Sequence, residues 1–122
     1  LVMNPNPVTL GFLQLSTDYV LDREIGGILS QIPGINWRLQ KMPPLEYGEI
    51  TETMFDLMKV YLGISSKVFW QKSSIKYGSL DVLSLACTSM SFILSPATVS
   101  KELSEGCQVA TNDTATSLLK LL

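Results

Sequence analysis

Residues 80–87 read LDVLSLAC, a nearly unbroken apolar run, and residues 88–91 (TSMS) follow it directly. A strand that is covered on both faces of a parallel sheet has this continuous apolar character. The run therefore predicts a buried strand that ends at Cys87. A second apolar run, bounded by turn-forming residues, occurs at residues 8–15 (VTLGFLQL). Two further strands are predicted at residues 35–42 (INWRLQKM), which Pro43-Pro44 ends, and at residues 107–110 (CQVA).

Helical patterns separate these four predicted strands. Leu21, Ile25, Ile28, Leu29 and Ile32 share one face of a helix predicted within residues 18–31. Further helices are predicted to start at Thr51 or Glu52, at the Ser95-Pro96 pair, and after Thr111-Asn112-Asp113. Strands that alternate with helices indicate an α/β fold with a four-stranded parallel sheet and helices on both faces, as in flavodoxin-like proteins. Residues 1–122 are predicted to form a single domain.

Composition excludes several classes of function. The chain has 122 residues, a net charge of −2 and no histidine, so it has neither the basic footprint of a nucleic-acid-binding protein nor a Cys-His or Ser-His pair. No apolar run reaches the roughly 20 residues of a membrane span. Neither a GxGxxG nor a P-loop motif is present, so we expect no nucleotide cofactor. Two widely separated cysteines and no visible signal peptide favour a reducing cytoplasm.

Polar segments follow each predicted strand, at the edge of the sheet where open α/β folds bind ligands. They are residues 16–18 (STD), 42–44 (MPP), 87–91 (CTSMS) and 111–113 (TND). Three of the four are rich in small hydroxyl or amide residues, which suit a small anion. Turns and helix caps select the same residue types, so this pattern alone does not identify a site.

Cys87 is the strongest candidate for chemistry. A thiol at the tip of a strand is expected to face outward over successive backbone N–H groups, which stabilise a thiolate and bind carboxylates. The competing interpretation is a small buried hydrophobic residue that ends a strand. Cys107 is predicted to be of this second kind, buried at the start of the last strand.

Three segments resemble one protein family. Residues 81–91 (DVLSLACTSMS) resemble the first cysteine motif of maleate isomerases, in the aspartate/glutamate racemase superfamily, where a strand ends in Cys-Thr-Ser. Residues 10–18 (LGFLQLSTD) are similar to the family's first strand and its Ser/Thr-rich loop, and residues 109–116 (VATNDTAT) are similar to its Thr-Pro-x-x-Ala motif. The chain departs from the pattern at Asp18, where many relatives carry Asn, at Met90, where Gly is frequent, and at Asn112 or Asp113, where proline is common.

The resemblance implies an enzyme of two pseudo-symmetric α/β halves with the active site between them, of which this chain is the N-terminal half. Cys87 would attack an alkene carbon of a cis-dicarboxylate, Thr88 and Ser89 would hold a carboxylate, and Thr17 and Asp18 would line the pocket. The enzyme would need neither cofactor nor metal, and its partners would be a small carboxylate substrate and further copies of itself.

Three alternatives stay open. Racemases of the superfamily use one thiol on each face of a carbon acid. Arylmalonate-decarboxylase relatives carry glycine where Cys87 stands, so the thiol favours isomerase or racemase chemistry. A non-catalytic α/β binding or oligomerisation module is the alternative of another class.

Overall fold

The structure, a computed structural model, describes residues 8–16, 18–44, 51–76, 80–105, 107 and 109–121. Within these residues four parallel strands form one sheet in the order β2-β1-β3-β4. The strands are β1 (Val8–Gln14), β2 (Ile35–Lys41), β3 (Val82–Leu85) and β4 (Ala110–Asp113). This arrangement confirms the predicted α/β class.

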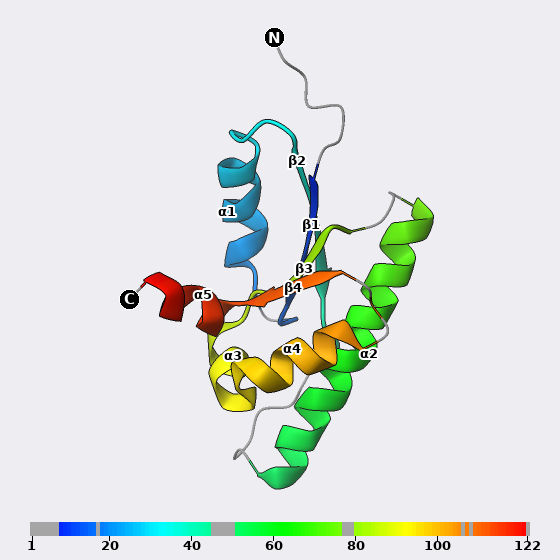
Figure 1. Ribbon diagram of the computed structural model, residues 1–122, viewed down its shortest axis with the longest axis vertical. Coiled ribbons are helices and arrows are strands. Elements are labelled where there is room, and N and C mark those ends of the chain that lie inside the picture. The colour runs from blue at the N-terminus through cyan, green and yellow to red at the C-terminus, as the bar shows by residue number, and fades with distance from the viewer. Residues whose placement is uncertain are drawn as a thin grey trace.

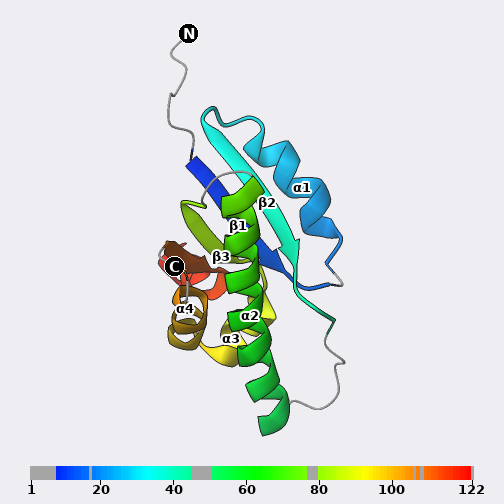
Figure 2. The same ribbon diagram turned by 90° about the vertical axis from the view of Figure 1, so that its right-hand side faces the viewer.

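Helices cover both faces of the sheet, as Figures 1 and 2 show. Helix α1 (Val20–Leu29) lies on one face, and the long helix α2 (Glu52–Lys76) lies on the other beside α4 (Pro96–Ser104). The short helix α3 (Thr88–Leu94) joins β3 to α4, and α5 (Thr114–Leu121) follows β4. Parallel strands need such crossovers, and each connection here contains at least one helix.

Backbone hydrogen bonds hold three strand ends together. The Met42 N–H donates to the Gln14 carbonyl, and the Ala86 N–H donates to the Leu13 carbonyl, both at 2.8 Å. The residues that follow β1, β2 and β3 therefore leave the sheet at the same edge. This carboxyl edge is where the sequence predicts a site.

The main core lies between the sheet and helices α2, α3 and α4. Fully buried side chains there include Leu13, Leu62, Leu83 and Leu103. Gly11 lets α2 and the start of the β3 segment approach β1, because a Cβ at this position would lie 2.6 Å from Leu80 Cδ1 and 3.0 Å from Phe69 Cε2.

Helix α1 buries less than its sequence predicts. Of the five apolar residues expected on its inner face, only Leu29 is buried, whereas Ile28 is 60% and Ile32 is 44% exposed. The helix packs mainly on β2, an edge strand. Because α1 lies above the edge of the sheet, only a narrow strip of the helix contacts the strands. The rest of its apolar face stays in contact with solvent.

Two strands differ in extent from the prediction. Strand β3 ends at Leu85 rather than Cys87, because the chain turns there into α3, a helix that the sequence pattern did not predict. Strand β4 covers Ala110–Asp113 rather than residues 107–110, so Cys107 precedes it. Strand β3 also starts two residues later than predicted, at Val82, whereas the boundaries of β1 and β2 agree with the prediction to within one residue.

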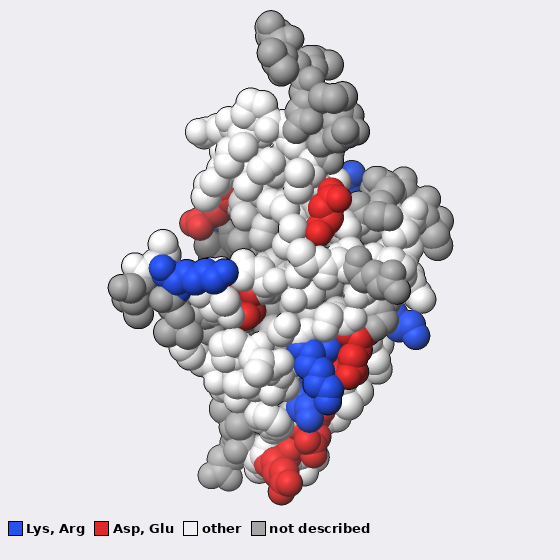
Figure 3. All heavy atoms as spheres, viewed as in Figure 1, with Lys and Arg blue, Asp and Glu red and all other residues white. Residues whose placement is uncertain are grey.

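The surface carries charges of both signs. On the face drawn in Figure 3, acidic and basic side chains alternate over the molecule without a broad patch of one sign. None of the described helices is long and apolar enough to cross a membrane.

Candidate functional site

Cys87 lies at the carboxyl edge of the sheet, two residues beyond the end of β3. Its backbone is extended (φ −149°, ψ 108°) and forms the N-cap position of α3. The Ser91 backbone N–H and hydroxyl both donate to the Cys87 carbonyl, at 3.1 and 2.7 Å. These bonds fix the turn from strand to helix and hence the position of the thiol.

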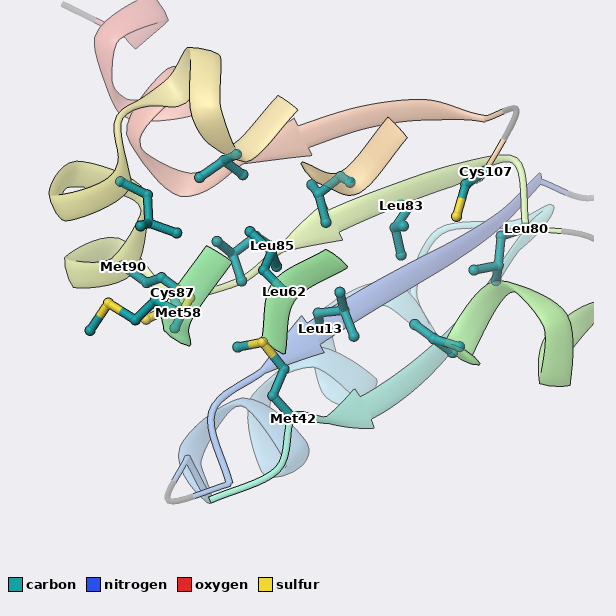
Figure 4. Packing of buried hydrophobic residues seen from close by; sticks show 14 residues of the cluster. Leu13, Met42, Met58, Leu62, Leu80, Leu83, Leu85, Cys87, Met90 and Cys107 are labelled. Atoms are coloured by element: carbon teal, nitrogen blue, oxygen red, sulfur yellow. The ribbon is translucent and has the colours of Figure 1, made fainter. Parts of the chain in front are cut away.

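The thiol is more enclosed than the sequence predicts. Cys87 is only 8% exposed and belongs to the apolar core, and Figure 4 shows it beside Met58 of α2 and Met90 of α3. The expected outward orientation assumed that a loop follows the strand. Because α3 starts at once, the side chain packs beneath the neighbouring helix instead.

Ser89 is the predicted partner that the structure places next to the thiol. Its Oγ lies 3.6 Å from Cys87 Sγ, within range of a weak hydrogen bond in which either atom can donate, and its side chain is exposed. The side chain of Thr88 lies outside what the structure describes, although its backbone belongs to α3.

The loop after β1 is described only in part. Thr17 lies outside the described residues. Asp18 uses its Oδ1 atom to accept hydrogen bonds from the backbone N–H groups of Val20 (3.0 Å) and Leu21 (3.1 Å). Its carboxylate therefore satisfies the first turn of α1, a role that caps commonly play. The Oδ1 atom of an asparagine could accept the same two bonds, so this role suits Asp18 as well as the Asn of the family pattern.

A polar cluster at the ends of β1 and β2 was not predicted. Gln14 and Lys41 are register partners on these strands, and Asp22 of α1 lies between their side chains. The Gln14 amide Nε2 donates to Asp22 Oδ1, and Lys41 Nζ lies 3.5 Å from Asp22 Oδ2. Lys41 Nζ also sits 4.0 Å from the centre of the Tyr19 ring.

This cluster has a definite electrostatic character. The hydrogen bond from Gln14, together with the Lys41 charge, holds the pKa of the Asp22 carboxyl below its ordinary value. The Gln14 side chain is buried, and its Oε1 atom has no hydrogen-bond partner among the described residues. In the sequence, a glutamine at the end of an apolar strand was the available sign of this cluster. Only the strand register shows which groups that glutamine contacts.

The described part of the chain also forms two cavities of about 130 Å³ each, the first of which is lined by Lys41 of the polar cluster and by Pro43 of the second predicted rim segment. One lies between the end of β2 and the middle of α2, and the other lies among α4, β4 and α5. Neither is lined by Cys87. Within the described part of the chain, no three His, Cys, Asp or Glu side chains gather to hold a metal.

Residues 111–113, the fourth predicted rim segment, line the second of these cavities. Asp113 Oδ1 accepts a hydrogen bond from the Thr116 N–H at 2.8 Å, and Asp113 Oδ2 accepts one from the Thr116 hydroxyl at 2.6 Å. Asp113 therefore caps α5, as the sequence predicts for this segment.

Cys107 has a structural environment. It is buried, and its thiol lies 3.6 Å from the Ser66 carbonyl oxygen, to which it donates. Burial raises the pKa of the Cys107 thiol above its ordinary value. A protonated thiol in the core agrees with the prediction that Cys107 is a small buried hydrophobic residue.

Comparisons with known proteins bear on the fold. No protein-family model matches the sequence, and no curated protein matches it significantly. A solved structure of maleate cis-trans isomerase from Nocardia farcinica, a cysteine-to-serine mutant with a covalently bound succinylcysteine intermediate, is similar with a TM-score of 0.64 and 14% sequence identity. The similarity covers 93% of this chain and 46% of that one, so this chain spans about half the length of the isomerase. The chain therefore shares its α/β fold with about half of that isomerase structure.

Proposed function

We propose that this chain is the N-terminal, cysteine-bearing half of an isomerase of the aspartate/glutamate racemase superfamily that acts on a small cis-dicarboxylate. One observation carries the proposal. Cys87 follows β3, which neighbours β1 where the crossovers of the sheet diverge, and such switch points bind ligands in open α/β sheets. The shared fold with an isomerase whose structure holds a succinylcysteine supports the same assignment.

The reaction needs a thiolate and no redox partner. The Cys87 sulfur adds to one alkene carbon, which forms a C–S bond and moves the π electron pair to the other alkene carbon, beside its carboxylate. The former double bond is now single and rotates. The electron pair then re-forms the double bond as the C–S bond breaks. The thiolate departs, and the product is the trans-dicarboxylate. No atom is gained or lost.

Groups near Cys87 suit this chemistry. The exposed hydroxyl of Ser89, 3.6 Å from the sulfur, can donate a hydrogen bond to the thiolate before and after the addition. The first-turn N–H groups of α3 follow Cys87 directly, and such groups favour a carboxylate. In this proposal Ser89 and Thr88 hold the carboxylate next to the carbon under attack.

Substrate must reach a sulfur that the core largely covers. The side chains that Figure 4 shows beside it, Met58 and Met90, are unbranched and adapt readily to new neighbours. We propose that they swing aside when the dicarboxylate enters. We further propose that a second α/β half closes the site over the carboxyl edge and brings the second thiol, because Cys107 is bonded within the core.

Incubation with maleate tests this function. Proton NMR follows the conversion of the maleate alkene signal into that of fumarate, and intact-protein mass spectrometry detects a covalent adduct. The chain is assayed alone and with a second α/β half supplied. We expect conversion in the completed enzyme, and we expect Cys87→Ser to lower the rate at least about a thousandfold, as loss of a nucleophile does.

Cys107→Ser is the matched control, because it removes the other thiol from a position that lies away from the carboxyl edge. It should leave the isomerisation rate within a few-fold of the parent. Equal rates for Cys87→Ser and the parent would remove Cys87 from the mechanism. If the completed protein shows neither adduct nor conversion, this proposal fails, and the racemase and the non-catalytic alternatives take its place.

A further inference from the structure

The cavity between the end of β2 and the middle of α2 has the size of a small organic molecule. It is lined by Gln40, Lys41, Pro43, Ile64, Ser65 and Val68. The proline, isoleucine and valine side chains make much of its surface apolar. Its volume of about 130 Å³ is close to that of an engineered apolar cavity, of about 150 Å³, that binds benzene. In Figure 2 the end of β2 lies beside the middle of α2, where this cavity is found.

A buried hydroxyl without a partner borders the cavity. Ser65 is 6% exposed, and its Oγ atom takes part in no hydrogen bond within the described part of the chain. An unsatisfied buried hydroxyl costs free energy, and folded proteins keep few of them. The next residue shows the usual arrangement, because Ser66 Oγ donates to the Gly63 carbonyl at 2.9 Å. A molecule in the cavity would supply the partner that Ser65 lacks.

The Ser65 side chain can turn toward the cavity without losing a bond. Its hydroxyl moves between staggered rotamers by rotation about a single C–C bond. Because the present rotamer forms no hydrogen bond, a rotamer that reaches a partner in the cavity is favoured over it. Water is a poor partner here, since an ordered water needs about two to four polar neighbours. The side chains of Pro43, Ile64 and Val68 offer none.

Gln40 determines which polar group the ligand should carry. Gln40 Nε2 donates to the Lys41 carbonyl at 3.1 Å, which leaves the Oε1 atom as an acceptor. A ligand hydroxyl can donate to this oxygen and accept from the Ser65 hydroxyl, whereas a carbonyl group only accepts. A single hydroxyl group on an apolar body therefore matches both polar side chains.

The charge of Lys41 favours an uncharged ligand, because it is already paired elsewhere. Lys41 Nζ lies 3.5 Å from Asp22 Oδ2 and 4.0 Å from the centre of the Tyr19 ring. Asp22 belongs to α1, which covers the other face of the sheet from α2, so the ammonium group points away from Ser65. No other charged side chain is among the described residues that line the cavity. An anion would find no unpaired positive charge there.

We propose that this cavity binds a small neutral alcohol or phenol. The apolar body of the ligand packs against Pro43, Ile64 and Val68, and its hydroxyl group bonds to Ser65 and Gln40. The bound molecule connects β2 to α2 near the carboxyl edge of the sheet. The proposal uses none of the residues assigned to isomerisation, so it does not depend on that function.

Titration of the isotope-labelled chain with phenol, followed by NMR, tests this site. We expect the amide signals of the end of β2 and the middle of α2 to shift and to saturate, with a dissociation constant on the order of 1 mM. Benzene is the comparison ligand because it lacks the hydroxyl, and it should shift the same signals with lower affinity. Val68→Phe places a larger side chain in the cavity and should remove the shifts for both ligands.

Two neighbouring serines separate the hydrogen bond from apolar packing. Ser65→Ala should weaken phenol binding by about three- to tenfold, the contribution of one hydrogen bond, and should leave benzene binding unchanged. Ser66→Ala is the matched control, because it removes a bonded hydroxyl from a residue that does not line the cavity. It should leave the affinity for phenol unchanged. The melting temperature should fall in Ser66→Ala but not in Ser65→Ala, which loses no hydrogen bond of the free protein.

Three results would each overturn the inference. The first is the absence of saturable shifts around the cavity with phenol, in which case the cavity holds water alone. The second is a Ser65→Ala variant that weakens phenol and benzene binding by the same factor, because the hydroxyl group would then play no part in recognition. The third is tighter binding of benzoate than of phenol, because the Lys41 charge would then be open to the ligand.

Discussion

At the scale of single residues, the carboxyl edge of this sheet carries a core thiol after β3 and an ion pair at the end of β2. Cys87 is held by its own α3 turn, whereas Asp22 depends on groups from two other elements, Gln14 of β1 and Lys41 of β2. A carboxylate stabilised in this way favours the folded state only while it is charged.

Asp22 should therefore contribute to acid denaturation. Its folded-state pKa is below the ordinary value of 3.8, so its contribution to stability is fully present above that value. It is lost as the pH falls through the folded-state pKa. We expect the melting temperature of Asp22→Asn to fall less steeply than that of the parent as the pH drops below 3.8. Parallel melting profiles for the two proteins in this range would contradict the assignment.

At the scale of secondary-structure elements, close packing of α2 on β1 depends on a glycine. The Leu80 and Phe69 side chains that would meet a Cβ at Gly11 are both buried, so they cannot move into solvent. Overpacking of a core of this kind costs about 1–3 kcal/mol. The absence of a methyl group at Gly11 therefore allows α2 to pack closely on β1.

Substitution of two glycines tests this packing. We expect Gly11→Ala to lower the free energy of unfolding by about 1–3 kcal/mol in urea denaturation. Gly27→Ala is the control, because a Cβ there meets nothing within 4 Å and alanine favours a helix by up to about 1 kcal/mol. It should leave stability unchanged or raise it. Equal effects of the two substitutions would show that α2 does not press on β1 at Gly11.

At the scale of the whole molecule, the two cysteine side chains become accessible to solvent through different opening motions of the fold. Cys107 is bonded to Ser66 of α2 inside the core, so the core must open to expose it. Cys87 lies at the edge of the sheet beside the exposed Ser89, so we expect a local opening of this edge to expose it. Local and global openings have different free energies in folded proteins.

Alkylation by iodoacetamide in native buffer should separate these openings. We expect Cys87 to react faster than Cys107, whose thiol is further protected by its raised pKa because only a thiolate reacts. Urea should accelerate the alkylation of Cys107 in proportion to the global unfolding of the chain. Peptide mass spectrometry assigns each site. Faster reaction at Cys107 would show that the core opens more readily than the edge, which would contradict this picture of the fold.

The amino-acid sequence by itself determined the fold class and most element boundaries. An apolar run located β1, and a strand pattern closed by Pro43-Pro44 located β2, each to within one residue. Ser95 with Pro96 correctly marked the start of α4, where the Ser95 hydroxyl accepts from the Thr98 N–H. These features are local, because strand and helix periodicity and helix capping depend on neighbouring residues.

Only the tertiary structure decided the surroundings of each candidate site residue. The sequence placed Cys87 at a strand end, but the burial of its thiol depends on α2, which begins 35 residues earlier in the chain at Glu52. The contacts of Gln14 with Asp22 and Lys41 follow from a strand register. The exposure of apolar residues on the outer side of α2 was not predicted, because that helix is apolar on both faces. Burial and pairing arise between segments distant in sequence, and periodicity carries no information about which of two apolar faces the core will take.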